Sequence, residues 1–179
     1  MKSNYVMFHD EKKCIGCQAC TVGCANVNDV PAGFGRVQVQ IKQDKDRYQF
    51  YRVSCQHCEK APCVGVCPTG ASYVDAEGIV KVNNARCIAC SYCQSACPYS
   101  VRYMDPDTRC PDKCDFCAES RLAKGELPVC VAVCPTDALS LVKADSGEAA
   151  EWIEKHPEAY RESKGGAGLA SVYRRKEIH

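Results

Sequence analysis

Sixteen of the seventeen cysteines in this chain fall into four groups of four with short, regular spacing. The first and third groups share the pattern C-x2-C-x2-C-x3-C, the second is C-x2-C-x4-C-x3-C, and the fourth is C-x2-C and C-x3-C separated by twelve residues. In chain order the groups are Cys14, Cys17, Cys20 and Cys24; Cys55, Cys58, Cys63 and Cys67; Cys87, Cys90, Cys93 and Cys97; and Cys114, Cys117, Cys130 and Cys134. Thiolates spaced this closely are typical ligands of zinc and of iron–sulfur clusters.

The spacing favours iron–sulfur chemistry. Three thiolates in C-x2-C-x2-C hold three irons of one [4Fe-4S] cube from a single short loop, and in two-cluster ferredoxins the fourth cysteine ligates the neighbouring cube. That fourth cysteine lies one helical turn further on, and Pro68, Pro98 and Pro135 follow it in three of the groups and end the turn. The sequence therefore predicts four clusters, but the spacing leaves open which groups pair.

Structural zinc and a disulfide scaffold are the competing interpretations. Zinc sites usually combine two C-x2-C pairs across a longer loop, whereas the triple unit occurs intact twice here. Disulfide scaffolds suit small secreted proteins, and the first ten residues contain no apolar segment typical of a signal peptide. Both alternatives are therefore disfavoured, and we expect no signal peptide.

Three further residues near the motifs are potential ligands. Cys110 precedes Cys114 by four residues, but Cys114 and Cys117 keep the C-x2-C spacing, so Cys110 is expected to be a non-ligand. A Rieske centre needs two histidines on one cluster, and only His57 lies inside a motif. We therefore interpret His57, and His9 as well, as turn residues.

Composition points to a fold that depends on its metal. Hydrophobic residues make up 46% of the chain, but that figure includes the cysteines, so the aliphatic core is thin for 179 residues. The formal net charge is +1, without the basic excess of nucleic-acid binders, and no apolar run is long enough for a membrane span. Four oxidised clusters would bring the net charge to about −7. Cations near the motifs are expected to offset it: Lys12, Lys13, Lys60, Arg86 and Lys113.

Short strands are expected between the motifs. Arg36–Ile41 alternates as a half-buried strand and turns at residues 44–46 into a second strand at 48–53. A hairpin is expected over residues 72–82, with its turn at 75–78. Residues 138–142 are predicted to form a strand matching Tyr5–Phe8. The predicted fold class is α+β, loop-rich, with short strands and helices around metal.

The last part of the sequence lies outside the cysteine repeat. Residues 148–155 are predicted to form a short amphipathic helix that Pro157 ends, and a basic stretch begins at Tyr173. A segment that docks a partner and a solvated surface tail are both open for residues 146–179.

With four motifs in this order, the chain resembles the four-cluster iron–sulfur (beta) subunits of molybdopterin oxidoreductase complexes. The resemblance covers Tyr5 to about Lys143, and the long gap from Cys117 to Cys130 is specific to that family. The stretches 5–12, 55–59 and 173–177 resemble the electron-transfer subunits of thiosulfate and polysulfide reductases more closely.

The resemblance implies that outer motifs pair with outer and inner with inner. Two ferredoxin-like modules result, one inserted in the other: residues 1–54 with 100–145, and residues 55–99, followed by the tail at 146–179. The implied ligand sets are Cys14, Cys17, Cys20 and Cys134 for cluster 1; Cys24, Cys114, Cys117 and Cys130 for cluster 2; Cys55, Cys58, Cys63 and Cys97 for cluster 3; and Cys67, Cys87, Cys90 and Cys93 for cluster 4. Some relatives have an aromatic residue and a three-iron cluster where Cys90 stands, so the cysteine here implies four [4Fe-4S] clusters.

The resemblance also implies a function. Such a subunit is not itself an enzyme: it relays single electrons between a quinone-linked membrane anchor and a molybdopterin catalytic subunit, here for thiosulfate or polysulfide reduction. Sulfur-reducing relatives lie on the periplasmic face of the inner membrane and are exported folded with a signal-bearing partner, so this location is expected. The alternative is a free cytoplasmic polyferredoxin that serves soluble enzymes.

Overall fold

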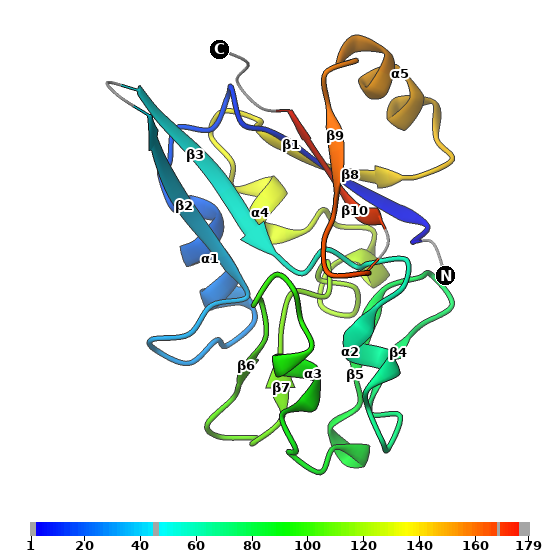
Figure 1. Ribbon diagram of the computed structural model, residues 1–179. Coiled ribbons are helices and arrows are strands. Elements are labelled where there is room, and N and C mark those ends of the chain that lie inside the picture. The colour runs from blue at the N-terminus through cyan, green and yellow to red at the C-terminus, as the bar shows by residue number, and fades with distance from the viewer. Residues whose placement is uncertain (1–2, 45–46, 168, 176–179) are drawn as a thin grey trace.

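A computed structural model describes residues 3–44, 47–167 and 169–175 of the protein (Figure 1). A four-stranded sheet in the order β8-β1-β10-β9 lies at one end of the molecule. Its strands are β1 (Tyr5–Asp10), β8 (Leu139–Lys143), β9 (Tyr160–Ser163) and β10 (Leu169–Arg175). β8 pairs antiparallel with β1, as the sequence predicts, and β10 pairs with β1 in parallel.

Among the described residues, three two-stranded hairpins complete the β structure. They are β2 (Val37–Asp44) with β3 (Arg47–Ser54), β4 (Ser72–Val74) with β5 (Val80–Val82), and β6 (Tyr103–Met104) with β7 (Pro111–Asp112). The first two hairpins confirm the predicted strand pairs. The predicted turn between β2 and β3 includes residues 45–46, which lie outside the described residues.

Four short helices carry cysteines and pack in two pairs. They are α1 (Ala19–Val27), α2 (Pro62–Gly65), α3 (Tyr92–Ser95) and α4 (Val129–Ala132). α1 lies against α4, and α2 lies against α3. Two 3-10 helices, η1 (Asn84–Arg86) and η2 (Leu122–Lys124), and α5 (Gly147–Lys155) complete the fold. Within the described part of the chain, no helix has the length and apolar character needed to cross a membrane.

Cysteine is a major constituent of the buried core. One core cluster combines Val80 with Cys63 and Cys93, and a second combines Val37 and Val129 with Cys24 and Cys117. The largest cluster also includes buried cysteines beside Met7, Ile79 and Phe116. The α+β, loop-rich fold class is therefore confirmed, and its interior is lined by thiols where most domains of this size place aliphatic side chains.

The interpretation of residues 146–179 as a solvated surface tail is wrong for the described residues, which pack on the protein's own sheet, whereas docking of a partner by this region stays a prediction. β10 lies between β1 and β9, and its Val172 is 3% exposed in the largest core cluster. α5 packs on the sheet through Trp152, whose ring stacks on Phe8 with centroids 4.1 Å apart. Strand pairing with β1 is a long-range contact that the local sequence pattern does not display. Residues 176–179 lie outside the described residues.

We predict that Val172→Ala lowers the free energy of unfolding by about 2 kcal/mol, because it leaves a cavity in the core beside Met7. Leu169→Ala is the matched control on the same strand, since Leu169 is 41% exposed; its effect should stay within about 0.5 kcal/mol. Thermal melts of the holoprotein provide the comparison. Equal effects of the two substitutions would contradict the docking of β10.

Candidate iron–sulfur centres

The two C-x2-C-x2-C loops share one backbone shape. φ is positive at Gly16 and Gln18 in the first loop, and at the corresponding Ala89 and Ser91 in the second. A Cβ at Gly16 would overlap the Phe50 ring, so glycine is required there. Left-handed φ is unfavourable for residues such as alanine and serine and persists where a functional geometry requires it. These turns let each loop wrap its three cysteines around a centre of its own.

The structure brings the four cysteines of set 1 together: Cys14, Cys17, Cys20 and Cys134. All four line one small, mostly apolar cavity, with Arg52 also in its wall. Burial raises the pKa of the Cys14 thiol, and a hydrogen bond from the Gly16 N–H opposes that rise. The charges of Cys20, Cys134 and Cys17 raise the pKa further.

Set 2 is buried throughout: Cys24, Cys114, Cys117 and Cys130. Burial, then the neighbouring charges of Cys114 and Cys130, raise the pKa of Cys24 to about 12, with Cys117 adding to the shift. Four thiols that oppose one another's ionisation in this way need a cation among them to become thiolates.

Set 3 comprises Cys55, Cys58, Cys63 and Cys97. Burial and then Cys55, Cys63 and Cys97 raise the pKa of Cys58 to about 12, so these four thiols also face one another. Set 4, which comprises Cys67, Cys87, Cys90 and Cys93, lines a second small cavity. The cysteines thus meet in the crossed arrangement, first motif with fourth and second with third, and not in sequence order.

The four sets lie in a row. The charge of Cys130 in set 2 acts on Cys20 in set 1, and that of Cys55 in set 3 acts on Cys114 in set 2. Cys63 of set 3 and Cys93 of set 4 share one core cluster. Cys17 and Cys90, in the first and last sets, are the two exposed cysteines of the seventeen. Both ends of the row therefore have an exposed cysteine, whereas set 2 is buried and set 3 has two buried and two half-buried cysteines.

Hydrogen bonds to the sulfurs repeat in two motifs. The Ser72 N–H donates to Cys67 Sγ at 3.4 Å, and the Ala138 N–H donates to Cys134 Sγ at 3.3 Å. The hydroxyls of Thr69 and Thr136 lie 3.7 and 3.8 Å from the same two sulfurs. Donors aimed at cysteine sulfur stabilise thiolate, and the Ser72 N–H holds the pKa of Cys67 below its ordinary value. Both features suit cluster ligands.

Two arginines that the motifs do not reveal lie beside the sulfurs. Arg52 Nη2 is 3.9 Å from Cys114 Sγ and 3.8 Å from Cys130 Sγ. Arg102 Nη2 is 3.2 Å from Cys63 Sγ. Both lie outside the motifs. Arg52 lies two residues after Phe50 in strand β3, so the two side chains are on the same face. A basic residue on that face is the one sign in the sequence that an arginine lies beside the cysteines.

The cations expected from the sequence divide into two groups. Lys12, Lys13, Lys60 and Arg86 are exposed, whereas Lys113 is buried at 3% exposure. Its ammonium donates to the carbonyl oxygen of Cys114 at 2.9 Å and to that of Val80. Lys113 is therefore the one of the five placed in the interior.

The interpretation of both histidines as simple turn residues requires correction. His9 belongs to strand β1 and is 2% exposed; burial, followed by Arg52 and Arg174, lowers its pKa to about 3. His57 has the positive φ of a turn residue but is fully buried, and its Nδ1 accepts from the Val80 N–H at 3.1 Å. Burial, then Lys113, Arg102 and Arg52, hold the pKa of His57 well below its ordinary value. Both rings are therefore neutral.

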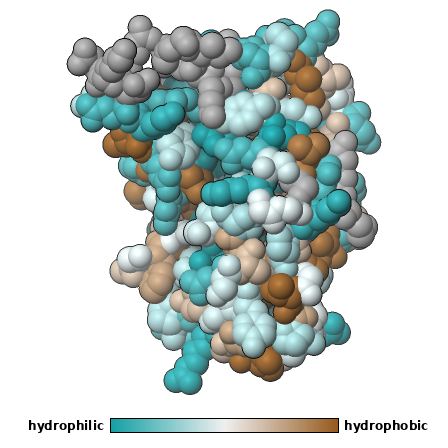
Figure 2. Space-filling view, in the orientation of Figure 1, coloured by the Kyte–Doolittle hydropathy of each residue, from teal (hydrophilic) through white to brown (hydrophobic). Residues whose placement is uncertain are grey.

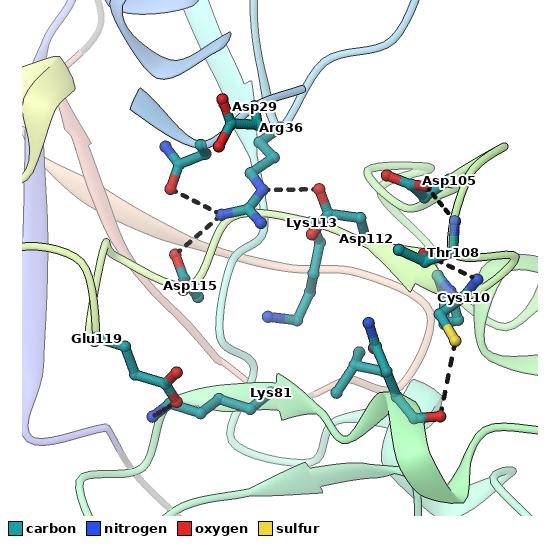
Figure 3. Close-up of a pocket in the computed structure, with 14 residues that line it drawn as sticks. Asp29, Arg36, Lys81, Asp105, Thr108, Cys110, Asp112, Lys113, Asp115 and Glu119 are labelled. Atoms are coloured by element: carbon teal, nitrogen blue, oxygen red, sulfur yellow. Dashed lines mark hydrogen bonds and ion pairs between the residues drawn. The ribbon is translucent and has the colours of Figure 1, made fainter. Parts of the chain in front are cut away.

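A polar cavity of about 370 Å³ lies beside the cysteine row (Figure 3). Arg36 pairs with two of the acids in its wall: Arg36 Nε lies 2.7 Å from Asp112 and Arg36 Nη1 lies 3.5 Å from Asp115. Cys110 lines this cavity, and its Sγ is 3.8 Å from the Asn84 carbonyl oxygen. Burial, then the neighbouring Cys87, raises the pKa of Cys110. Cys110 thus lies next to Cys87 of set 4 without lining the small cavity of that set, and its non-ligand role stays a prediction.

The side chains around the sets fit [4Fe-4S] clusters. All seventeen cysteines are free thiols. Arg52 Nε and Arg102 Nη1 are buried donors without a hydrogen-bond partner among the described residues, and buried donors normally have one. Inorganic sulfide is an acceptor that such donors can reach when a cluster is bound.

Comparison with known proteins agrees with this arrangement. Models of a 4Fe-4S dicluster domain match residues 47–144 and residues 13–71. The thiosulfate reductase electron transfer subunit PhsB of Salmonella typhi is 56% identical over 185 residues, covering 100% of this chain and 96% of PhsB. The B subunit of polysulfide reductase from Wolinella succinogenes is 51% identical over 146 residues, covering 78% of this chain and 76% of that protein.

A third relative is named as a ferredoxin-like protein. The uncharacterized ferredoxin-like protein YdhX of Escherichia coli K12 is 49% identical over 180 residues, covering 98% of this chain and 81% of YdhX. The domain matches and the identity over the full length lead to one assignment. The protein belongs to the 4Fe-4S dicluster domain family and, within it, to the iron–sulfur subunits that include PhsB and the B subunit of polysulfide reductase.

Proposed function

We propose that this protein relays single electrons through four [4Fe-4S] clusters, one held by each cysteine set. The observation that carries the proposal is the row of four sets with an exposed cysteine at each end, Cys17 and Cys90. Each cluster, when bound, takes up and gives back one electron. The protein holds neighbouring sets close together and keeps sets 2 and 3 largely away from water, so electrons are exchanged with partners at sets 1 and 4.

The protein itself performs no substrate chemistry in this proposal. Each set supplies four cysteines, which leaves no open iron position for a substrate. The packing of α1 on α4 and of α2 on α3 supports the nested modules, residues 1–54 with 100–145 around residues 55–99. Nesting joins the two cluster pairs in one short protein.

The proposed partners are a molybdopterin catalytic subunit and an integral membrane anchor that exchanges electrons with quinone. Supporting this, PhsB is named as a subunit of thiosulfate reductase, and a second relative is named as a component of polysulfide reductase. The proposed terminal acceptor is accordingly thiosulfate or polysulfide. Exposed apolar side chains flank both ends of the row: Ile15 is 58% and Ile88 is 61% exposed. Figure 2 shows hydrophobic residues interspersed with polar ones at the end of the molecule that carries α2 and α3.

We further propose that the complex lies on the periplasmic face of the inner membrane, with this protein exported folded beside a signal-bearing partner. The resemblance to sulfur-reducing members of the family supports this location. Protease treatment of spheroplasts should degrade the protein, whereas protection until the cells are lysed would place it in the cytoplasm.

The decisive experiment is anaerobic purification from native membranes with iron and molybdenum measured in the same sample. We expect about sixteen irons per chain, as four cubes require, together with molybdenum and two further subunits. Reduced quinone analogue should then reduce the clusters, and thiosulfate or polysulfide should reoxidise them. The same iron content without molybdenum or retained subunits would instead identify a free polyferredoxin.

A further inference from the structure

Three lysine or arginine side chains are buried within the described part of the protein: Arg52 at 5%, Arg102 at 4% and Lys113 at 3% exposure. A buried cation is costly unless an anion compensates for it. The hydrogen bonds found for these three run to cysteine sulfur, serine hydroxyl and backbone carbonyl groups. Sulfur ligands with their clusters, which carry net negative charge, would supply the compensating anions.

Arg52 lies between sets 1 and 2. Its Nη2 approaches the sulfurs of Cys114 and Cys130 in set 2 at 3.9 and 3.8 Å. The same side chain forms part of the wall of the cavity that the set 1 cysteines line. Burial lowers the pKa of Arg52, whereas the sulfurs of Cys130, Cys114, Cys20 and Cys24, when ionised as cluster ligands, raise it. Those four sulfurs come from both sets.

Arg102 occupies the corresponding place between sets 3 and 4. Its Nη2 is 3.2 Å from Cys63 Sγ in set 3 and 2.9 Å from the Ser72 hydroxyl. The backbone N–H of Ser72 donates in turn to Cys67 Sγ of set 4. Arg102 therefore contacts set 3 through Cys63 and reaches set 4 through Ser72, and Cys93 of set 4 also raises the pKa of Arg102 through its charge and a side-chain hydrogen bond.

Lys113 lies where sets 2 and 3 meet. Its ammonium donates to the carbonyl oxygen of Cys114, a set 2 residue, and to that of Val80, which packs on Cys63 of set 3. Burial raises the pKa of Cys55 in set 3, and Lys113 is the strongest influence that opposes the rise. In Figure 3, Asp112 and Asp115 on the cavity side pair with Arg36. The hydrogen bonds found for the Lys113 ammonium run to the carbonyl oxygens of Cys114 and Val80, at the junction of the two sets.

We propose that Arg52, Lys113 and Arg102 form a line of buried charges, one at each of the three junctions between neighbouring clusters, and that each raises the reduction potentials of the two clusters it separates. The inference rests on the proposed four-cluster relay. A fixed positive charge stabilises the more negative, reduced state of a cluster. Because one cation faces two clusters, it stabilises an added electron on either side of the junction and offsets repulsion between clusters reduced together.

The test uses the purified complex and redox titration followed by electron paramagnetic resonance, which measures the cluster potentials independently of activity. Arg52→Gln should lower the potentials of clusters 1 and 2 and leave those of clusters 3 and 4 unchanged. Arg102→Gln should lower the potentials of clusters 3 and 4, and Lys113→Gln should lower the potentials of clusters 2 and 3. Arg52→Lys, which keeps the charge, should restore potentials close to those of the parent protein.

Arg86→Gln is the matched control, because Arg86 is an exposed cation next to Cys87 in sequence. This substitution should change the reduction potential of cluster 4 little, since water and salt screen exposed charges. If Arg52→Gln loses a cluster that Arg52→Lys retains, the charge is again responsible; equal loss in both overturns the assignment at that junction. Four clusters with unchanged or uniformly shifted potentials in all three variants overturn the inference alone, whereas fewer than four clusters in the parent protein overturn the relay as well.

Discussion

Removing the iron is expected to abolish the cooperative melting of the protein and most of its native circular dichroism. The region around α2 and α3 should be lost first, because its core cluster consists of Val80 between Cys63 and Cys93. Without metal these thiols cannot supply the folding free energy that small metal-dependent domains draw from ligation. The cluster around Phe8, Ala149 and Trp152 contains no buried cysteine and should persist longest.

Two readouts resolve this order. Hydrogen exchange after chelation in the presence of a disulfide reductant should show loss of protection across residues 55–99 before the strands β1 and β10. Fluorescence of Trp152, which stacks on Phe8, follows the slower phase. Restoring iron and sulfide should return both signals, which serves as the control for damage. A chelated protein that keeps its dichroism and its cooperative melt would refute a metal-dependent fold.

Breaking the row at its exposed end should stop electron transfer without unfolding the protein. Cys90→Ser removes one ligand of set 4, and because Cys90 is exposed the substitution leaves no buried cavity. Cluster 4 is expected to be lost or converted to a three-iron cluster, with clusters 1 to 3 retained. Iron should fall from about sixteen per chain to between about twelve and about fifteen. Since the sets lie in series, transfer between the two partners should fall to the rate without this protein.

Cys110→Ser is the matched control for this experiment. Cys110 is buried within the same half of the protein and lies close to Cys87, yet it belongs to no set. Its replacement should leave the iron content, the four resonance signals and electron transfer as they are. A Cys90→Ser protein with full iron and four unaltered signals would show that Cys90 is not a ligand, and iron loss in Cys110→Ser would show that Cys110 is one.

The sequence by itself determined the local features of this protein. Cysteine spacing, and the prolines after Cys67, Cys97 and Cys134, predicted clusters held by loops and single helical turns, because those contacts are made within a few residues. Alternation of apolar residues predicted β2, β3 and the small hairpin of β4 and β5 for the same reason. The α+β class and the thin aliphatic core followed from these local patterns and from composition.

Only the tertiary structure decided which distant residues meet. Spacing allowed the motifs to pair in either order, and the packing of α1 on α4 brings Cys24 to Cys114 and Cys130. The sequence left a surface tail and a partner-docking segment open for residues 146–179, and the pairing of β10 with β1, which places Val172 in the core, contradicts the surface tail. Arg52 and Cys130 are 78 residues apart, so no motif contains both. The fold buries this strand arginine against the sulfurs of Cys114 and Cys130, and burial is a property of the folded protein.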